Sequence, residues 1–113
     1  MKDLLIVGAG GLGRMTMEAA REEYNCFFVD DGFEKGTVIC DSKVVGGIKD
    51  LEELSKEYKN LIIAIGNNAF REKLMNEMIV LGYNIPTIIN KTAYISPYSK
   101  IGYGTIILSN ASV

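Results

Sequence analysis

The apolar residues of this chain fall in short runs that are separated by polar or amphipathic stretches. The run at residues 3–7 is continuous and ends in glycines, which is typical of a strand buried on both faces of a parallel sheet. Residues 25–31 suit a second strand that ends at paired aspartates, residues 61–66 a further central strand and residues 84–90 a last strand, and Lys43–Gly46 suits a short edge strand. The hydrophobic pattern therefore predicts a strand in each of these segments.

The stretches between these strands favour helices. Residues 15–24 are rich in helix formers. Asp50 and Glu53 have the spacing of a capping box, which predicts a helix from there to about Tyr58. Residues 32–42 contain glycine breakers, so we expect them to be irregular.

A third helix is expected to begin near Asn67 or Asn68 and to end before Gly82, which stands where the residue after a C-terminal cap should be. The apolar side chains of this helix share one face: Phe70, Leu74, Met78 and Leu81. Strands that alternate with helices imply right-handed crossovers and a parallel sheet covered on both sides. We therefore expect residues 1–90 to form a small Rossmann-like α/β domain.

From Ile89 onward the chain reads in units of six residues. Each unit opens with an aliphatic residue, and these are Ile89, Ile95, Ile101, Ile107 and Val113. A small residue follows four places later, at Ala93, Ser99, Thr105 and Ala111. This is the period of a hexapeptide β-helix, in which three hexads make one coil, and it predicts that residues 91–113 begin such a helix. Because coils need several neighbours to bury their apolar faces, we expect the sequence to be the front of a longer protein.

Composition and charge narrow the classes of function. The chain has 113 residues, a hydrophobic content of 48% and a net charge of −2, so it reads as one globular domain without the charge that favours nucleic acid or an anionic membrane. No apolar run is long enough to span a membrane, and we expect a cytoplasmic protein in which Cys26 and Cys40 are structural thiols. The absence of histidine excludes histidine catalysis and histidine metal ligands within these residues, and we expect no metal site.

A glycine-rich turn follows the first predicted strand and precedes a helix, which is the context that favours phosphate binding. Gly8 permits the tight turn, Gly10 allows close backbone approach to a pyrophosphate, and Gly13 lets helix and strand pack closely. The free amides at the start of the helix would face the diphosphate. The alternative is that these glycines only turn the chain. The motif is Gly8-Ala9-Gly10-Gly11-Leu12-Gly13.

Polar residues follow two other predicted strands. Asp30 lies 20 residues after Gly10, and either Asp30 or Asp31 could accept a ribose hydroxyl, or both could simply form a turn. Gly66 and Asn67 end the next central strand at the same edge of the sheet, where open α/β sheets bind ligands, although an asparagine there also suits a helix cap.

Two arginines lie at the starts of the helices beside these loops. Arg14 and Arg71 could each reach a phosphate, but solvated arginines on a helix surface are commoner. The spacing predicts a nucleotide with a diphosphate and does not distinguish nicotinamide, flavin or sugar at its far end.

The order of these features resembles the NeuD/PglD-type sugar O-/N-acetyltransferase family. The resemblance rests on the GAGGLGR turn, the strand that ends in Asp-Asp, the VVGG element, the AIGNN strand end and the hexads that follow. It implies a Rossmann-like domain that holds a nucleotide-sugar acceptor, a UDP-linked amino sugar by preference, followed by the first coil of a truncated left-handed β-helix. In such a family the diphosphate contacts correspond to Gly10, Gly11, Leu12 and Gly13, the base contacts to Asp30 and Asp31, and the strand-end backbone to Ala64, Ile65 and Gly66.

The resemblance also implies an acetyl-CoA cofactor, a homotrimer held by the longer β-helix, and a histidine general base. The acetyl-CoA site and that histidine would lie beyond Val113, so we expect this chain alone to be inactive and to be a monomer or a weak oligomer. One departure is Leu12, which stands where the family often has histidine.

Two other classes of function compete with this one. An NAD-binding oxidoreductase or redox-sensing module would use the same glycine turn and Asp30, although it does not require hexads. A non-catalytic nucleotide-binding scaffold is compatible with Leu12 and with the lack of histidine.

Overall fold

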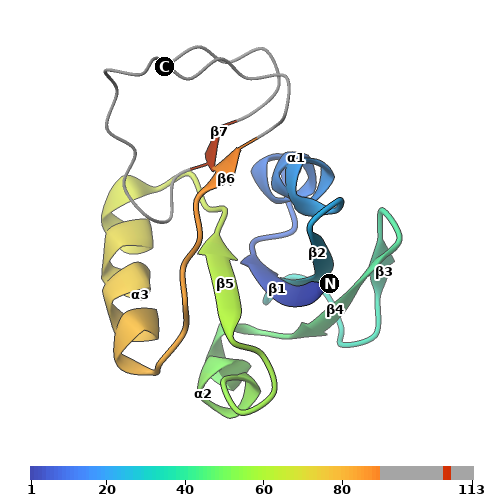
Figure 1. Cartoon of the computed structure of the whole chain (residues 1–113). Coiled ribbons are helices and arrows are strands. Elements are labelled where there is room, and N and C mark those ends of the chain that lie inside the picture. Colours follow the sequence, from blue (N-terminus) through green and yellow to red (C-terminus); the bar gives the residue numbers. More distant parts are fainter. Residues whose placement is uncertain (90–105, 108–113) are drawn as a thin grey trace, which may run out of the picture.

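The computed structural model describes residues 1–89 and 106–107 of the chain (Figure 1). Its main sheet has five strands in the order β3-β4-β2-β1-β5. The central strand β1 runs parallel to β2 and to β5, β2 runs parallel to β4, and only β3 is antiparallel to its neighbour. The strands are β1 Lys2–Val7, β2 Tyr24–Val29, β3 Val38–Ile39, β4 Ser42–Gly46 and β5 Asn60–Ile63. A small Rossmann-like domain with a parallel central sheet was predicted, and it is confirmed.

The centre of the sheet is its most buried part. All four apolar residues Leu4–Val7 of β1 have no exposed surface, and neither do Leu61 and Ile62 of β5. Continuous apolar residues are required here because helices and loops cover both faces of the two strands. The two apolar runs in the sequence therefore located the centre of the core.

Successive residues of β2 show which segments cover the two faces. The Phe28 ring lies beside Gly13 of helix α1 (Gly11–Ala20). The neighbouring Phe27 ring instead meets Tyr58 edge-on, with 5.3 Å between the ring centroids. Because adjacent side chains in a strand point to opposite faces, α1 covers one face and the segment after helix α2 (Leu51–Leu54) covers the other.

Two predicted boundaries near the glycine turn are wrong. The helix placed at 15–24 begins at Gly11, because the glycine turn itself forms the first helical turn with Gly10 as its N-cap. It ends at Ala20, and Tyr24 already pairs with Lys2 in the parallel register of β1 and β2. Tertiary pairing with β1 therefore overrides the helix propensity of the last predicted residues.

The segment 32–42, predicted to be irregular, contains strand β3 and a hairpin. Cys40 and Asp41 both have positive φ angles, of 49° and 67°, which is the backbone of a two-residue turn between antiparallel strands. Since β3 lies outside β4, the prediction that Lys43–Gly46 forms the edge of the sheet is wrong.

The predicted helix from Asp50 to Tyr58 is shorter and is capped differently. A 3-10 turn, η1 (Ile48–Asp50), leads into α2, which ends at Leu54. Asp50 and Glu53 do not form the predicted capping box, because the Asp50 side chain makes no cap hydrogen bond to α2. Its Oδ2 accepts the Gly47 N–H at 2.8 Å, so the acid half of a capping box lies one turn earlier than predicted, and Gly47 has no side chain to supply the other half.

Helix α3 (Asn68–Val80) agrees with the prediction at both ends. Asn67 is its N-cap, and Gly82 has a φ of 95°. The Gly82 N–H donates to Ile79 O at 3.0 Å, and the Tyr83 N–H donates to Met78 O at 3.1 Å. This pair of hydrogen bonds is typical of a Schellman motif.

The predicted apolar face of α3 is only partly correct. Leu74 and Met78 are buried, and Leu81 is half-buried. Phe70 is 41% exposed, because it lies in the first turn of the helix at the open edge of the sheet.

The predicted strand at 84–90 is shorter than expected. Asn84 forms an isolated bridge with Asn60, and only β6 (Ile88–Ile89) is a strand. It pairs in parallel with β7 (Ile106–Ile107), Ile88 with Ile106 and Ile89 with Ile107. The offset is 106 − 88 = 18 residues, which is three hexads. The other hexad positions lie outside the described residues.

Candidate site at the carboxyl edge of the sheet

The order of strands places a switch point between β1 and β5. From β1 the chain moves to β2 and β4 on one side, and then returns to β5 on the other side. Ligands of open α/β sheets bind outside the carboxyl ends of the strands at such a point. The loops that meet there are the glycine turn after β1 and the residues Ala64–Asn67 after β5, both of which were predicted to form the site.

Two glycines of the turn are required by the fold itself. Gly8 has a φ of 108°, and a Cβ atom there would lie 2.6 Å from Ala64 O, so the turn passes directly against the end of β5. A Cβ atom at Gly13 would overlap the Gly8 carbonyl oxygen. The predicted role of Gly13, close packing of helix and strand, is confirmed.

Gly10 and Gly11 differ from these two glycines. A Cβ atom at either position would meet no atom within 4 Å beyond its neighbours in the chain and the backbone of its own helix, and Gly10 has an ordinary φ of −80°. The fold therefore does not require glycine at these positions. No side chain caps the start of α1, so the first helix amides have no side-chain acceptor at the cap.

Leu12 and Arg14 flank the uncapped start of α1. Leu12 is half-buried and packs against the core, so its side chain belongs partly to the interior. The Arg14 side chain folds back over the turn, where its Nε donates to Ala9 O at 3.2 Å. This position keeps a positive charge beside the helix N-terminus.

Asp30 binds the glycine turn. Its Oδ2 accepts the Ala9 N–H at 2.8 Å, and its Oδ1 accepts the Gly32 N–H at 2.8 Å. The half-buried carboxylate therefore holds the turn after β1 against the loop after β2. Each oxygen keeps further lone pairs, so contact with a ribose or a base stays a prediction.

Asp31 joins a different pair of loops. Its side chain is exposed, and its Oδ1 accepts the Ile48 N–H at 2.8 Å, across 17 residues of sequence. The loop after β4 is thereby tied to the end of β2.

The residues after β5 separate into buried and open positions. Ala64 is buried and its N–H donates to Val7 O at 2.8 Å, while Ile65 packs against the core. Gly66 and Asn67 are exposed. The Asn67 Oδ1 accepts the Phe70 N–H at 2.9 Å, so the asparagine does cap α3, and its amide nitrogen lies at the open edge.

Sequence reasoning missed the contribution of the loop after β4. It noted the VVGG element without assigning a role to Gly46, Gly47 or Ile48. The pattern Gly47-x-x-Asp50, an N-cap position followed three residues later by an acid, could have indicated this capped loop.

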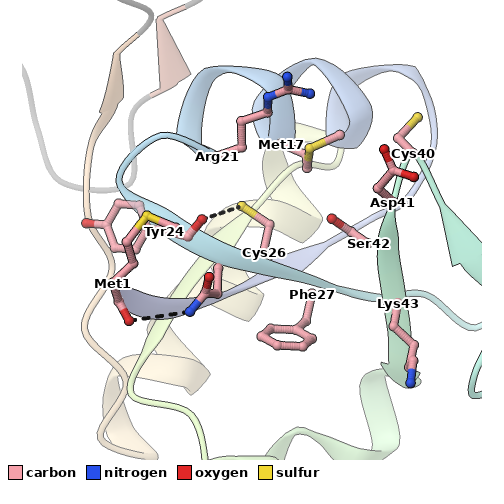
Figure 2. A pocket seen from close by; sticks show the side chains of 11 residues that line it. Met1, Met17, Arg21, Tyr24, Cys26, Phe27, Cys40, Asp41, Ser42 and Lys43 are labelled. Atoms are coloured by element: carbon pink, nitrogen blue, oxygen red, sulfur yellow. Dashed lines mark hydrogen bonds between the residues drawn. The ribbon is translucent and has the colours of Figure 1, made fainter.

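A hollow of about 590 Å³ lies beside the first residues of β2, at the other end of the sheet from this site. Figure 2 shows the side chains that line it. It is bounded by the C-terminal part of α1, the first residues of β2 and the turn between β3 and β4. Its walls include both cysteines, Cys26 and Cys40, which are free thiols. Burial raises the pKa of the Cys26 thiol to about 11, so this thiol stays protonated and is not an activated nucleophile.

Within 1–89 and 106–107, no group of three or more histidine, cysteine, aspartate or glutamate side chains is placed to hold a metal ion. In the same part of the chain, every helix is too short or too polar to cross a membrane.

Solved structures share this fold across almost the whole chain. The acetyltransferase domain of PglB from Neisseria gonorrhoeae, in complex with acetyl coenzyme A, is 32% identical with a TM-score of 0.86, over 98% of this chain and 55% of that one. A perosamine N-acetyltransferase variant from Caulobacter crescentus, in complex with CoA and GDP-perosamine, is 24% identical with a TM-score of 0.89, over 100% and 54% of the two chains. A Rex-family repressor shares only the fold, at 18% identity and a TM-score of 0.57 over 100% of this chain and 53% of that one.

Sequence comparison gives the same assignment. UDP-N-acetylbacillosamine N-acetyltransferase of Bacillus subtilis is 31% identical over 117 residues, which cover 96% of this chain and 52% of the relative. The chain thus spans about half the length of the relatives it matches. The model of the PglD N-terminal domain matches residues 3–78. The chain therefore belongs to the PglD N-terminal domain family, which forms the first domain of NeuD/PglD-type sugar acetyltransferases.

Proposed function

We propose that this chain is the acceptor-binding part of an acetyl-CoA-dependent sugar N-acetyltransferase. Residues 1–90 bind a nucleotide sugar at the carboxyl edge of the sheet, and residues 91–113 begin a left-handed β-helix. The 18-residue offset between β6 and β7 supports the second part, because one coil of three hexads requires this register.

The open space over the start of α1 is the observation that carries the proposal. Helix amides there have no side-chain cap, and Gly10 and Gly11 leave room that the fold does not need. A diphosphate in this space would accept hydrogen bonds from the amides and gain from the positive end of the helix dipole. Arg14 would add a cation on the same side.

A UDP-linked amino sugar is our first choice of ligand. The support is the Bacillus subtilis relative, whose name gives a UDP-linked substrate and an N-acetyl product. In the reaction, the amine of the sugar would attack the thioester carbonyl of acetyl-CoA while a general base takes its proton. The chain contains no histidine, so we place that base and the acetyl-CoA site in a longer homotrimeric parent, outside the present sequence.

A ligand panel tests the proposal directly. Thermal shift and calorimetry would compare UDP-, GDP- and CMP-linked amino sugars with NAD, since a ligand that binds the folded state raises its stability. We expect at least one nucleotide sugar to bind more tightly than NAD. Binding of NAD without a response to any nucleotide sugar would favour the redox alternative and overturn the proposal.

The Gly10→Val variant tests the location of the site. The new side chain meets no protein atom near its Cβ, so the fold should survive with a loss of at most about 1 kcal/mol from the poorer N-cap. It would, however, occupy the space proposed for the diphosphate, and we expect binding to be lost. Glu18→Val, an exposed change on the same helix, serves as the control and should bind normally. Unchanged affinity of a folded Gly10→Val protein would contradict the assignment.

A further inference from the structure

Asp31 connects the ends of two neighbouring parallel strands. It follows β2, and its Oδ1 accepts the N–H of Ile48, which follows β4, at 2.8 Å. Both strands end at the carboxyl edge, so this bond fixes the loop after β4 beside the proposed nucleotide site. The side chain acts here on backbone, whereas the family resemblance implied that it contacts the base of the nucleotide.

Gly47 shows how closely the two loops approach each other. Its φ of −105° is open to any residue, so backbone conformation does not require glycine. A Cβ atom at Gly47 would nevertheless overlap Asp31 Oδ1, and the next two atoms it would meet also belong to Asp31. The lack of a side chain at position 47 therefore makes room for this carboxylate.

Two further hydrogen bonds hold the same loop. Asp50 Oδ2 accepts the Gly47 N–H at 2.8 Å, and Gly46 O accepts the Asp30 N–H at 3.0 Å. These two contacts hold Gly46 and Gly47, and the bond from Asp31 adds Ile48 to the residues fixed beside the end of β2. Loss of that bond would release Ile48 while Gly46 stays bonded to Asp30.

From these contacts we propose that Asp31 is a positioning residue that acts on nucleotide binding through Gly47 and Ile48. Its carboxylate sets the loop after β4 as the outer wall of the site. The proposal rests on the proposed function for its ligand, a nucleoside diphosphate or a sugar linked to one. It predicts that the acceptor oxygen of the side chain matters and that its charge does not.

The test is a double-mutant cycle on the 113-residue chain, with UDP and GDP as probes in calorimetry. Asp31→Ala removes the acceptor, and Gly47→Ala displaces the carboxylate without removing it, so each should weaken binding roughly tenfold. The double variant should be no weaker than either single one, because the new methyl group has no carboxylate to displace. Asp31→Asn keeps an acceptor oxygen and should stay within about threefold of the wild type. Glu34→Ala, an exposed acid in the following loop, is the control.

Direct contact between Asp31 and the base gives the opposite pattern. Asp31→Asn would then bind as poorly as Asp31→Ala, and the effects of Asp31→Ala and Gly47→Ala would add. Either result overturns the positioning role.

Hydrogen exchange of the Ile48 amide reads the bond without any ligand, and so distinguishes failure of this proposal from failure of the proposed function. We expect protection in the wild type and in Asp31→Asn, and faster exchange in Asp31→Ala and Gly47→Ala. An Ile48 amide that exchanges alike in all four proteins would overturn the role of Asp31 even if UDP binds. A wild type that binds neither UDP nor GDP would overturn the ligand but leave the exchange pattern as a test of the bond.

Discussion

At the scale of single residues, the glycines of one motif are present for different physical reasons. Gly8 and Gly13 are required because the backbone of the turn, β5 and α1 meet without room for a side chain. Gly10 and Gly11 face open space. A sequence motif therefore combines positions that the fold needs with positions that only a ligand would need, and substitution can separate the two kinds.

We predict that Gly13→Ala destabilises the chain strongly and Gly11→Ala does not. The methyl group at position 13 would overlap Gly8 O, which costs about 3 kcal/mol or more unless the helix shifts. At position 11 the methyl group lies in open space at the helix start, where alanine is the better helix former. Urea denaturation of both variants measures the difference. Equal midpoints would show that α1 can move away from β1 at little cost.

Tyr83 gives a pH-dependent prediction. Its buried O–H donates to Leu51 O at 2.6 Å, and burial raises the pKa of Tyr83 to about 12. Below pH 10 the side chain is neutral in the folded and in the unfolded protein, and its contribution to the free energy of unfolding is complete. Between about pH 10 and 12 the unfolded state loses its proton first, so the contribution falls as pH rises.

The Tyr83→Phe variant should therefore be about 1 kcal/mol less stable than the wild type at pH 8. This difference should shrink as the pH approaches 12, because the variant lacks the titrating group. Denaturation at a series of pH values gives both quantities. A difference that is constant over the whole range would mean that Tyr83 ionises alike in the folded and unfolded states.

At the scale of elements, local sequence chemistry specified the two central strands and the ends of α3. The apolar runs of β1 and β5 located the core, and Asn67 and Gly82 marked the ends of α3, because each of these features depends on a few adjacent residues. The predictions failed where contacts with residues distant in the sequence determine the secondary structure. Tyr24 belongs to β2 through its pairing with Lys2, and β3 exists because a two-residue turn brings Val38 beside Lys43.

The candidate site shows the same division. The glycine turn and the end of β5 were predicted because both directly follow apolar runs, and the topology brings them together at the switch point. The bonds from Asp30 to Ala9 and from Asp31 to Ile48 could not be predicted, because they cross 21 and 17 residues and depend on strand order. Whether these acids also contact a ligand stays a prediction.

We predict that Asn67→Ala lowers stability by about 1 kcal/mol through loss of the α3 cap. Asn68→Ala is the matched control, because Asn68 is exposed, lies inside the helix and follows the cap directly. Thermal unfolding of the two variants compares them under the same conditions. If both variants lose the same stability, helix propensity or another contact at this edge, and not the cap, accounts for the loss.

At the scale of the whole molecule, α1 connects the proposed nucleotide site to the start of the hexads. Its N-terminus faces the site, and β6 lies against its side (Figure 1). Ile88 of β6 is buried in the common core, and Ile106 of β7 packs against that core. The first pair of the proposed coil is thus supported by the Rossmann-like domain.

We predict that the 113-residue chain is a monomer or a weak oligomer whose Rossmann-like part folds without further coils. Light scattering over a concentration series should give a mass near that of one chain. Hydrogen exchange should be slow in β1 and β5, where Leu4–Val7, Leu61 and Ile62 are fully buried. A trimer that persists on dilution would show that one coil is sufficient for assembly.

The pairing of Ile88 with Ile106 also limits how this part of the gene can change in length. A single inserted codon between the two strands would shift every later aliphatic residue by one place, out of its position in the six-residue repeat. Six inserted codons would restore the position in the hexad. They would, however, place the following segment on a different one of the three sides of the proposed coil. A gain or loss of 18 codons would keep each later residue in its hexad position and on the same side of the coil, one coil further along or back, so we expect natural length variation in this stretch of the family to occur in whole coils.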